Sequence, residues 1–278
     1  MQKSLWAYWH DGEAGAPYLV RQCLDSWRRL NPEWTLRLLD RETAEEWADV
    51  AEYRARDDIG LQAFTDILRL ALLARHGGAW VDATLYCARP LDRWLAARTR
   101  DHFFGFASQR PDRLITTWFL YGDGESRLLN AWHDEVRRYW RAHRFSPVGY
   151  GRKQILRKLT SLRKRHLLPN DIWFSGLVTR IVGAYPYPVN MYLFERALSR
   201  RPELRPLWHE RDHLYDEPAE RLQNRFGMNA PRTSASVAFL EGESTPVHKL
   251  NWRQDLGEAK SGSNLELLLE RSAQRTDT

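Results

Sequence analysis

The sequence contains few cysteines and no long hydrophobic run. Its 278 residues include two cysteines, Cys23 and Cys87, and both fall on faces expected to be apolar. We therefore predict two small buried thiols in a protein of a reducing compartment. Because the sequence has neither an N-terminal signal pattern nor an apolar run long enough to span a bilayer, we expect a soluble, cytoplasmic protein.

The sequence also lacks an excess of acidic charge. It has 42 Lys and Arg against 36 Asp and Glu, and the net charge of +6 favours anionic partners such as nucleotides, nucleic acids or an acidic membrane surface. With 43% hydrophobic and 28% charged residues, the composition excludes disordered and fibrous proteins. Thirteen tryptophans and eleven tyrosines supply rings both for a core and for ligand stacking.

Strands and helices alternate along the first half of the chain. Residues 4–9 and 34–38 predict strands, and a helix between them begins at Pro17 and stops at Asn31-Pro32. Thr43 and Glu46 form a capping-box pattern for a short helix that reaches about residue 52. This alternation predicts an α/β fold with a mostly parallel sheet flanked by helices, in which ligands bind at the carboxyl ends of the strands.

The most informative stretch is residues 63–87, which predicts a helix, a tight turn and a strand. Apolar residues recur at helical spacing over 64–73, and Asp66 and Arg69, three apart, project from one side of that helix. Gly77 and Gly78 end it. The following segment alternates through residue 87, which predicts one strand carrying Asp82 on a single face. Taken singly, the Asp–Arg pair also fits an ordinary surface ion pair.

The rest of the chain predicts further elements. Residues 103–107, 114–121 and 236–240 are expected to be strands, and 126–139 an amphipathic helix capped by Asp123 or Ser126. Asp171 is expected to cap a helix that runs through residue 181, residues 184–194 to be irregular, and 218–226 to form a short helix. We expect the polar residues 258–278 to fray around a short helix at 264–271.

A basic segment spans residues 152–165. Seven Lys or Arg surround Ile155, Leu159 and Leu162, which recur at helical spacing. This pattern predicts a basic amphipathic helix that contacts an anionic membrane, as a peripheral protein on its inner face, or steers a polyanionic acceptor. A solvated surface helix gives the same pattern. Nucleic-acid binding has no recognisable motif here.

The central block resembles a known family. Thr65-Asp66 with Arg69 matches S/T-D-x-x-R, and the segment GGAWVDAT at 77–84 matches G-G-x-W-x-D-A-T. The order of these motifs is similar to that of DXD-motif glycosyltransferases, which include the glucosylating toxins, and above all to that of the capsular-polysaccharide-synthesis sugar transferases. The resemblance implies one GT-A-like domain at 1–257, with a nucleotide-sugar half at 1–120, an acceptor half at 121–257, and a polar tail at 258–278.

The resemblance also implies roles for individual residues. Asp82 and Thr84 take the two DXD positions and would hold Mn²⁺ or Mg²⁺ together with His248, although a hydroxyl in place of the second carboxylate is a poorer ligand for a hard cation. Asp66 would bind sugar hydroxyls, and Arg69 the diphosphate. The remaining expected contacts are Tyr8, Trp9, Ala83 and Lys249 on the nucleotide-sugar side and Thr117, Trp118, Asp171 and Trp173 on the acceptor side. Trp9 would stack on uracil, unless it only packs the sheet.

The function implied is transfer of a sugar, with retention, from a UDP-sugar or related donor to a glycan or lipid-linked acceptor in bacterial surface polysaccharide synthesis. Asp66, Arg69 and Asp82 would be the catalytic residues, and no nucleic acid would take part. Two alternatives stay open. A non-catalytic relative would bind nucleotide sugars or glycans without transfer, and a basic nucleic-acid-binding protein would bind DNA or RNA with steep salt dependence.

Overall fold

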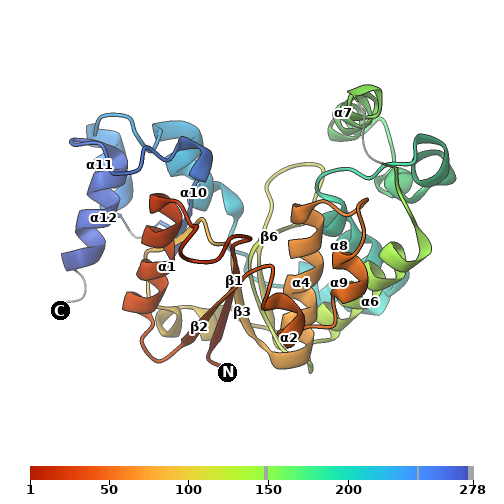
Figure 1. Ribbon diagram of the computed structural model, residues 1–278, viewed down its shortest axis with the longest axis horizontal. Coiled ribbons are helices and arrows are strands. Elements are labelled where there is room, and N and C mark those ends of the chain that lie inside the picture. The colour runs from red at the N-terminus through yellow and green to blue at the C-terminus, as the bar shows by residue number, and fades with distance from the viewer. Residues whose placement is uncertain (147–149, 243, 275–278) are drawn as a thin grey trace.

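A computed structural model describes residues 1–146, 150–242 and 244–274 and shows an α/β protein around a five-stranded sheet (Figure 1). The strand order is β2-β1-β3-β6-β5, with β1 and β3 in the middle region. β1 pairs in parallel with β2 and β3, whereas β6 is antiparallel to both β3 and β5. Four of the five strands therefore share one direction, which confirms the predicted mostly parallel sheet. The strands are β1 Ser4–Tyr8, β2 Thr35–Leu39, β3 Gly78–Val81, β5 Phe103–Ala107 and β6 Ile115–Gly122.

Helices cover both faces of this sheet (Figure 1). On one face lies α1 (Tyr18–Leu30), with α10 (Asp216–Arg221), α11 (Ser234–Glu241) and α12 (Asn264–Gln274) on the same side. On the other face lie α4 (Leu61–His76), α6 (Arg127–Ala142) and α8 (Val189–Arg200). Within the described ranges, no helix is both long and apolar enough to cross a bilayer.

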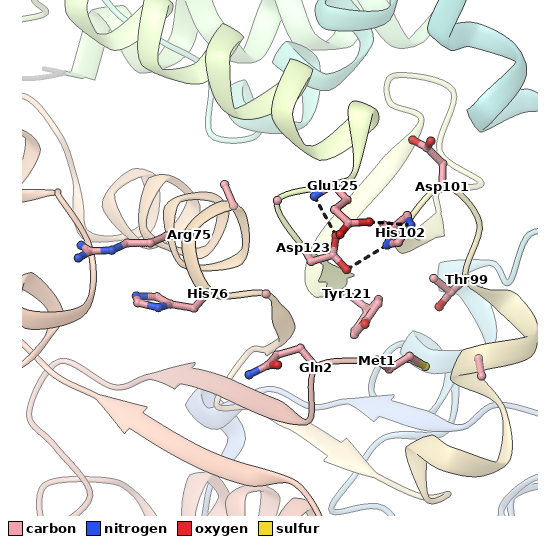
Figure 2. A pocket seen from close by; sticks show the side chains of 14 residues that line it. Met1, Gln2, Arg75, His76, Thr99, Asp101, His102, Tyr121, Asp123 and Glu125 are labelled. Carbon is pink, nitrogen blue, oxygen red and sulfur yellow. Dashed lines mark hydrogen bonds and ion pairs between the residues drawn. The ribbon is translucent and has the colours of Figure 1, made fainter.

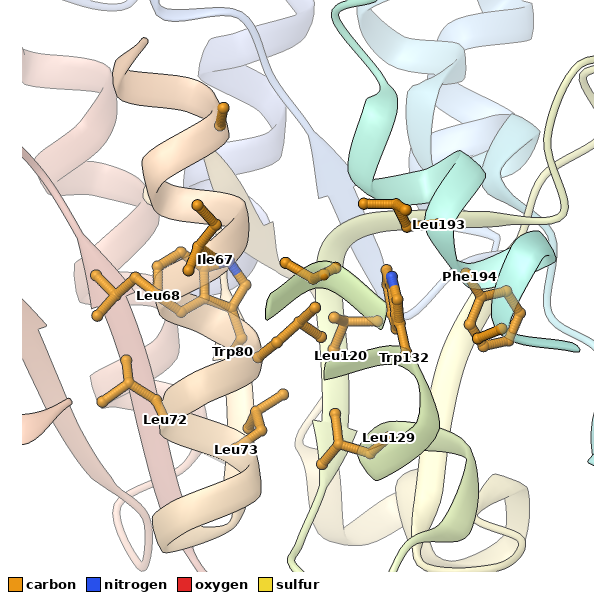
Figure 3. Close-up of a cluster of buried hydrophobic side chains, with 14 of the residues drawn as sticks. Ile67, Leu68, Leu72, Leu73, Trp80, Leu120, Leu129, Trp132, Leu193 and Phe194 are labelled. Atoms are coloured by element: carbon orange, nitrogen blue, oxygen red, sulfur yellow. The ribbon is translucent and has the colours of Figure 1, made fainter. Parts of the chain in front are cut away.

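The alternation of side chains along the strands supplies two separate cores. Leu5 and Ala7 of β1 face α1, whereas Trp6 and Tyr8 face the α4 layer. The core on the α4 side is the larger of the two and joins α4, β3, β6, α6 and α8 (Figure 3). Cys23 and Cys87 are buried and unbridged, as predicted, and burial raises the pKa of the Cys87 thiol to about 12.

The remaining helices and strands are short, apart from α7. They are α2 Ala44–Trp47, α3 Ala51–Arg54, β4 Leu85–Cys87, α5 Leu95–Arg98, α7 Tyr150–Lys164, α9 Arg205–His209 and β7 Val247–Lys249, with 3-10 turns at Leu91–Arg93, Asn170–Phe174, Pro202–Leu204 and Trp252–Gln254 and π-turns at Leu177–Val182 and Leu222–Phe226. The predicted helices corresponding to α1, α4, α6, α7 and α10 are confirmed, and Ser126 caps α6 by accepting a hydrogen bond from the Leu129 amide.

The prediction of one continuous strand after Gly78 is wrong. β3 ends at Val81, and residues 82–84 form a turn in which the Leu85 amide donates to the Asp82 carbonyl over 2.8 Å. β4 then leaves the main sheet and pairs with β7 in a separate two-stranded sheet. The DXD-like segment is therefore the turn between two sheets.

The capping box expected at Thr43 is also absent. The Thr43 hydroxyl donates to Asp40 Oδ1 over 2.8 Å instead of accepting from the helix, and the expected helix is divided into α2 and α3. The expected helix at Asp171 is likewise two short turns that begin after Pro169, and Asp171 makes no capping hydrogen bond.

In the last third of the chain two further expectations fail and one is confirmed. The segment 184–194 is irregular only up to Pro188, after which α8 begins. The expected strand at 236–240 is helix α11, because Thr233 and Ser236 form a capping box. The short helix expected at 264–271 is confirmed as α12, in which Leu265 and Leu268 are buried against α11. Residues 275–278 of the predicted tail lie outside the described residues, and the division into domains stays a prediction.

Candidate functional site

Several of the predicted site residues lie at the carboxyl ends of β1 and β3. Asp82 follows β3 directly, and its amide donates to the carbonyl of Trp118 on β6 over 2.9 Å. The parallel register of β1 and β3 places Tyr8, at the end of β1, at the same edge of the sheet. This is the edge at which open α/β sheets bind ligands.

Asp82 is the centre of a charged cluster. Its Oδ1 accepts a hydrogen bond from Trp80 Nε1 over 3.0 Å and lies 3.3 Å from Arg69 Nη1. Its Oδ2 accepts from Lys249 Nζ over 2.8 Å. Burial alone would raise the pKa of Asp82, but the charges of Lys249 and Arg69 outweigh burial and lower the pKa to about 2. The carboxylate is therefore ionised at neutral pH.

Arg69 is held from several directions by α4, β3 and β6. Its Nη2 lies 2.9 Å from Asp66 Oδ1, and its Nη1 donates to the carbonyl of Thr117. The guanidinium carbon lies 4.9 Å from the ring centroid of Trp80, a cation–π contact. Asp66 and Arg69, three residues apart in the sequence, thus form a buried ion pair and not an ordinary surface pair.

Asp66 is only 3% exposed. Burial raises its pKa above the ordinary range, and the charge of Arg69 counteracts part of this effect. In this structure the carboxylate holds Arg69 in place, and its predicted contact with sugar hydroxyls stays a prediction.

Lys249 comes to the cluster from a segment 165 residues away in the sequence. The two-stranded sheet sets Leu85 opposite Lys249, and the Leu250 amide donates to the Thr84 carbonyl over 2.9 Å. Lys249 Nζ donates to Thr84 Oγ1 over 2.6 Å as well as to Asp82. The structure thus brings Lys249 together with Asp82 and Thr84, whereas Ala83 is buried in the turn. The contact of Lys249 with a nucleotide sugar stays a prediction.

Sequence reasoning missed two residues of the site. Asn190, fully buried in α8, accepts from Trp140 Nε1 through its Oδ1, and its amide contributes to lowering the pKa of Asp66. Tyr187 precedes α8 and is 67% exposed; burial of its hydroxyl raises its pKa, and the charges of Asp66 and Asp82 act in the same direction. Both lie in the segment expected to be irregular, where no periodic pattern marks the start of a helix after Pro188.

The two candidates for the base-binding side point in different directions. Tyr8 is buried in the α4 core, and its hydroxyl lies 3.0 Å from His10 Nδ1. Trp9 is half-buried and packs edge-on against Trp252, with ring centroids 5.7 Å apart. Trp252, 40% exposed, lies three residues after Lys249. Sequence reasoning did not name it, although it ends the TPVHKLNW segment in which Lys249 was found.

The four expected acceptor residues do not form one surface. Thr117 and Trp118 are buried in β6, and Trp118 packs on Phe106 with centroids 4.6 Å apart. Trp173 has no exposed surface and stacks on Tyr192, so its assignment to an acceptor surface is wrong in this structure. Asp171 is exposed and lines a cavity of about 480 Å³ beside Arg196 and Arg200.

A divalent cation does not fit the predicted ligand set. His248, which precedes Lys249 on β7, is buried with its ring edge-on to Phe239 at 5.7 Å. Because successive residues of a strand point to opposite sides, Lys249 rather than His248 reaches Asp82 and Thr84. Across residues 1–146, 150–242 and 244–274, no group of three or more His, Cys, Asp or Glu could hold a metal ion.

A larger cavity of about 830 Å³ lies at the opposite edge of the sheet (Figure 2). It is lined by Gln2 and Gly77, at the starts of β1 and β3, and by His102, which interacts with Asp123 and Glu125. Since Gly77 and Asp82 lie at the two ends of β3, this cavity is separate from the charged cluster.

The family of the protein follows from its sequence profile together with this geometry. Residues 1–162, more than half of the chain, match the family described as capsular polysaccharide synthesis protein. The chain belongs to this family. The matched part contains Asp66, Arg69, Asp82 and Thr84, so the motifs that carried the resemblance lie within it, and the mixed α/β architecture is consistent with a GT-A-like fold.

Three fungal proteins are similar over part of their length. The O-glycosyltransferase PaGT of Phomopsis amygdali is 29% identical over 64% of this chain and 46% of its own. The O-glycosyltransferase braB of Annulohypoxylon truncatum is 33% identical over 58% of this chain and 42% of its own. The glycosyltransferase afumC of Aspergillus fumigatus (strain CBS 144.89 / FGSC A1163 / CEA10) is 28% identical over 50% of this chain and 40% of its own. The chain thus spans less than half the length of these curated relatives.

Proposed function

We propose that this protein is a glycosyltransferase that takes its sugar from a nucleoside diphosphate sugar, with UDP as the nucleotide. The observation that carries the proposal is the convergence of Arg69 and Lys249 on Asp82 at the carboxyl edge of the sheet. The names of the three fungal relatives support the same activity. Trp9 and Trp252 supply rings beside this edge for stacking on the base.

The cluster suits the chemistry of the leaving group. When the bond between the sugar and the diphosphate breaks, negative charge develops on the diphosphate oxygens. Arg69 and Lys249 stabilise such charge without reorganising, because Asp66, Asp82 and Thr84 already fix their positions. Asp66 and Asp82 thus act on the reaction through the cations that they hold.

The acceptor is proposed to be a glycan or a lipid-linked glycan of surface polysaccharide synthesis, in keeping with the description of the family. Helix α7 projects from the rest of the molecule (Figure 1) and carries exposed Ile155 among its basic residues, which supports peripheral contact with an anionic membrane. We carry over retention of the anomeric configuration from the resemblance. The anomeric configuration of the transferred sugar in the product tests it.

Asp82→Asn tests the donor site. The variant keeps the shape of the side chain but removes the charge that holds Arg69 and Lys249, so we expect UDP binding measured by calorimetry to weaken by about tenfold or more, and sugar transfer to fall with it. Asp92→Asn is the matched control, because Asp92 also accepts from a lysine, Lys3, but in an exposed pair. Melting temperatures of both variants equal to that of the wild-type protein would show that the fold is intact.

Two results would contradict the proposal. Full UDP binding and transfer in Asp82→Asn would remove the site assignment. Wild-type protein that binds UDP but neither transfers nor hydrolyses any UDP-sugar would indicate the non-catalytic relative instead.

A further inference from the structure

Lys249 occupies the place between Asp82 and Thr84 where the DXD resemblance puts a divalent cation. Its ammonium lies 2.8 Å from Asp82 Oδ2 and 2.6 Å from Thr84 Oγ1, so it bridges the two DXD positions. The other oxygen of Asp82 faces Arg69 and Trp80. Both carboxylate oxygens therefore already have cationic or hydrogen-bonding partners.

The ligand chemistry favours an ammonium over a divalent metal at this place. One carboxylate and one neutral hydroxyl carry less charge than the carboxylate pair of a DXD motif, and a hydroxyl is the poorer ligand for a hard cation such as Mn²⁺ or Mg²⁺. The same two groups are good acceptors for an ammonium, which donates up to three hydrogen bonds. A divalent ion would also have to approach two positive side chains that are already in place.

The position of Lys249 is built into the backbone. Lys249 pairs with Leu85 across the small sheet, and the next amide, of Leu250, donates to the Thr84 carbonyl. The strand that delivers the lysine is thus bonded directly to the turn that carries Asp82 and Thr84. The side chains of Lys249 and Asp82 remain 19% and 26% exposed, so a ligand in solution reaches both.

We propose that Lys249 replaces the divalent cation of the DXD site, and that this protein binds the diphosphate of its donor without a metal. The inference rests on the proposed function, since it concerns the same donor site. Arg69 and Lys249 together would supply the positive charge that a metal supplies in the DXD enzymes, and Thr84 would serve to orient the lysine.

The test is calorimetric titration of the full chain with UDP, in EDTA and in Mn²⁺. We expect the same dissociation constant under both conditions. Lys249→Met, which keeps much of the aliphatic stem but removes the charge, should weaken UDP binding by about tenfold or more under both conditions. Lys3→Met is the matched control, because Lys3 forms a similar but exposed pair with Asp92 over 2.7 Å.

A double variant makes the test reciprocal. Lys249→Ala combined with Thr84→Asp removes the ammonium and restores the second carboxylate, so UDP binding should now strengthen when Mn²⁺ is added. If Mn²⁺ does not strengthen UDP binding by this double variant, the proposal that Lys249 stands in place of a metal ion is contradicted.

The outcomes separate this inference from the proposed function. Wild-type binding of UDP that disappears in EDTA and returns with Mn²⁺ would overturn the inference and leave the glycosyltransferase proposal standing. Unchanged UDP affinity in Lys249→Met would also overturn it. No binding of UDP under either condition would overturn the proposed function itself. The comparison of wild-type protein in EDTA and Mn²⁺ needs no variant to fold.

Discussion

At the scale of single residues, the assignment that sequence reasoning could not decide is that of Trp9. A tryptophan directly after β1 either stacks on the uracil ring or only packs the sheet. The structure shows a half-buried Trp9 whose ring contacts the exposed Trp252 edge-on. An exposed aromatic pair of this kind suits stacking on a flat base, whereas the proposed place of the diphosphate is beside Arg69 and Lys249.

We predict that Trp9→Leu weakens binding of UDP but not of pyrophosphate. Stacking of a base on an aromatic ring contributes about 1–3 kcal/mol, so the loss for UDP should be about tenfold. Calorimetric titration of the same variant with both ligands checks this. Trp47→Leu serves as the control, because Trp47 is also partly buried but packs on Trp6, a buried residue within β1. Equal losses for UDP and pyrophosphate would indicate a general distortion of the site.

At the scale of elements, the turn from α4 to β3 fixes where Asp82 lies. Gly77 ends α4 with φ +67°, and its carbonyl accepts from Trp6 Nε1 over 2.9 Å. Gly78 has φ +104°, and a side chain there would place its Cβ 2.4 Å from the Ser4 carbonyl oxygen. The close approach of the two backbones requires glycine and sets β3 against β1.

We predict that Gly78→Ala lowers the free energy of unfolding by about 3 kcal/mol, because both the backbone conformation and the contact with Ser4 become strained. Urea denaturation measures this. Gly176→Ala is the control, since Gly176 has φ −58° and nothing within 4 Å of an added Cβ. Its free energy of unfolding should change by less than about 0.5 kcal/mol. Similar losses in both variants would show that neither backbone strain nor contact governs the turn.

The same elements show what could be predicted from the sequence. The α4 helix, the glycine turn and the Asp66–Arg69 pair follow from local spacing, so they could be recognised. The break after Val81 could not, because the apolar alternation continues through Ala83 and Leu85 in a turn as it would in a strand. That break depends on β7, more than 160 residues later, and on the lysine it delivers. Asn190 was missed for a local reason, because no periodic pattern marks the start of α8 after Pro188.

At the scale of the whole molecule, a half-buried histidine outside the site links the stability of the fold to pH. His133 lies on α6, whose buried residues pack in the α4–α6–α8 layer, and is itself half-buried. Burial lowers its pKa from 6.5 to about 4, and the charge of Arg137 acts in the same direction. As the pH falls below 6.5, the unfolded chain takes up a proton that the folded chain does not, so the stability contributed by the neutral ring is lost between pH 6.5 and 4.

We predict that acidification from pH 7 to pH 5 lowers the free energy of unfolding by about 2 kcal/mol more in the wild-type protein than in His133→Gln. Urea denaturation of both proteins at the two pH values gives the difference, and other groups that titrate in this range cancel between them. Asp82 does not contribute, because its pKa of about 2 keeps it ionised throughout. Parallel losses in the two proteins would show that His133 takes up its proton equally in the folded and unfolded states, and that acid weakens this layer through another group.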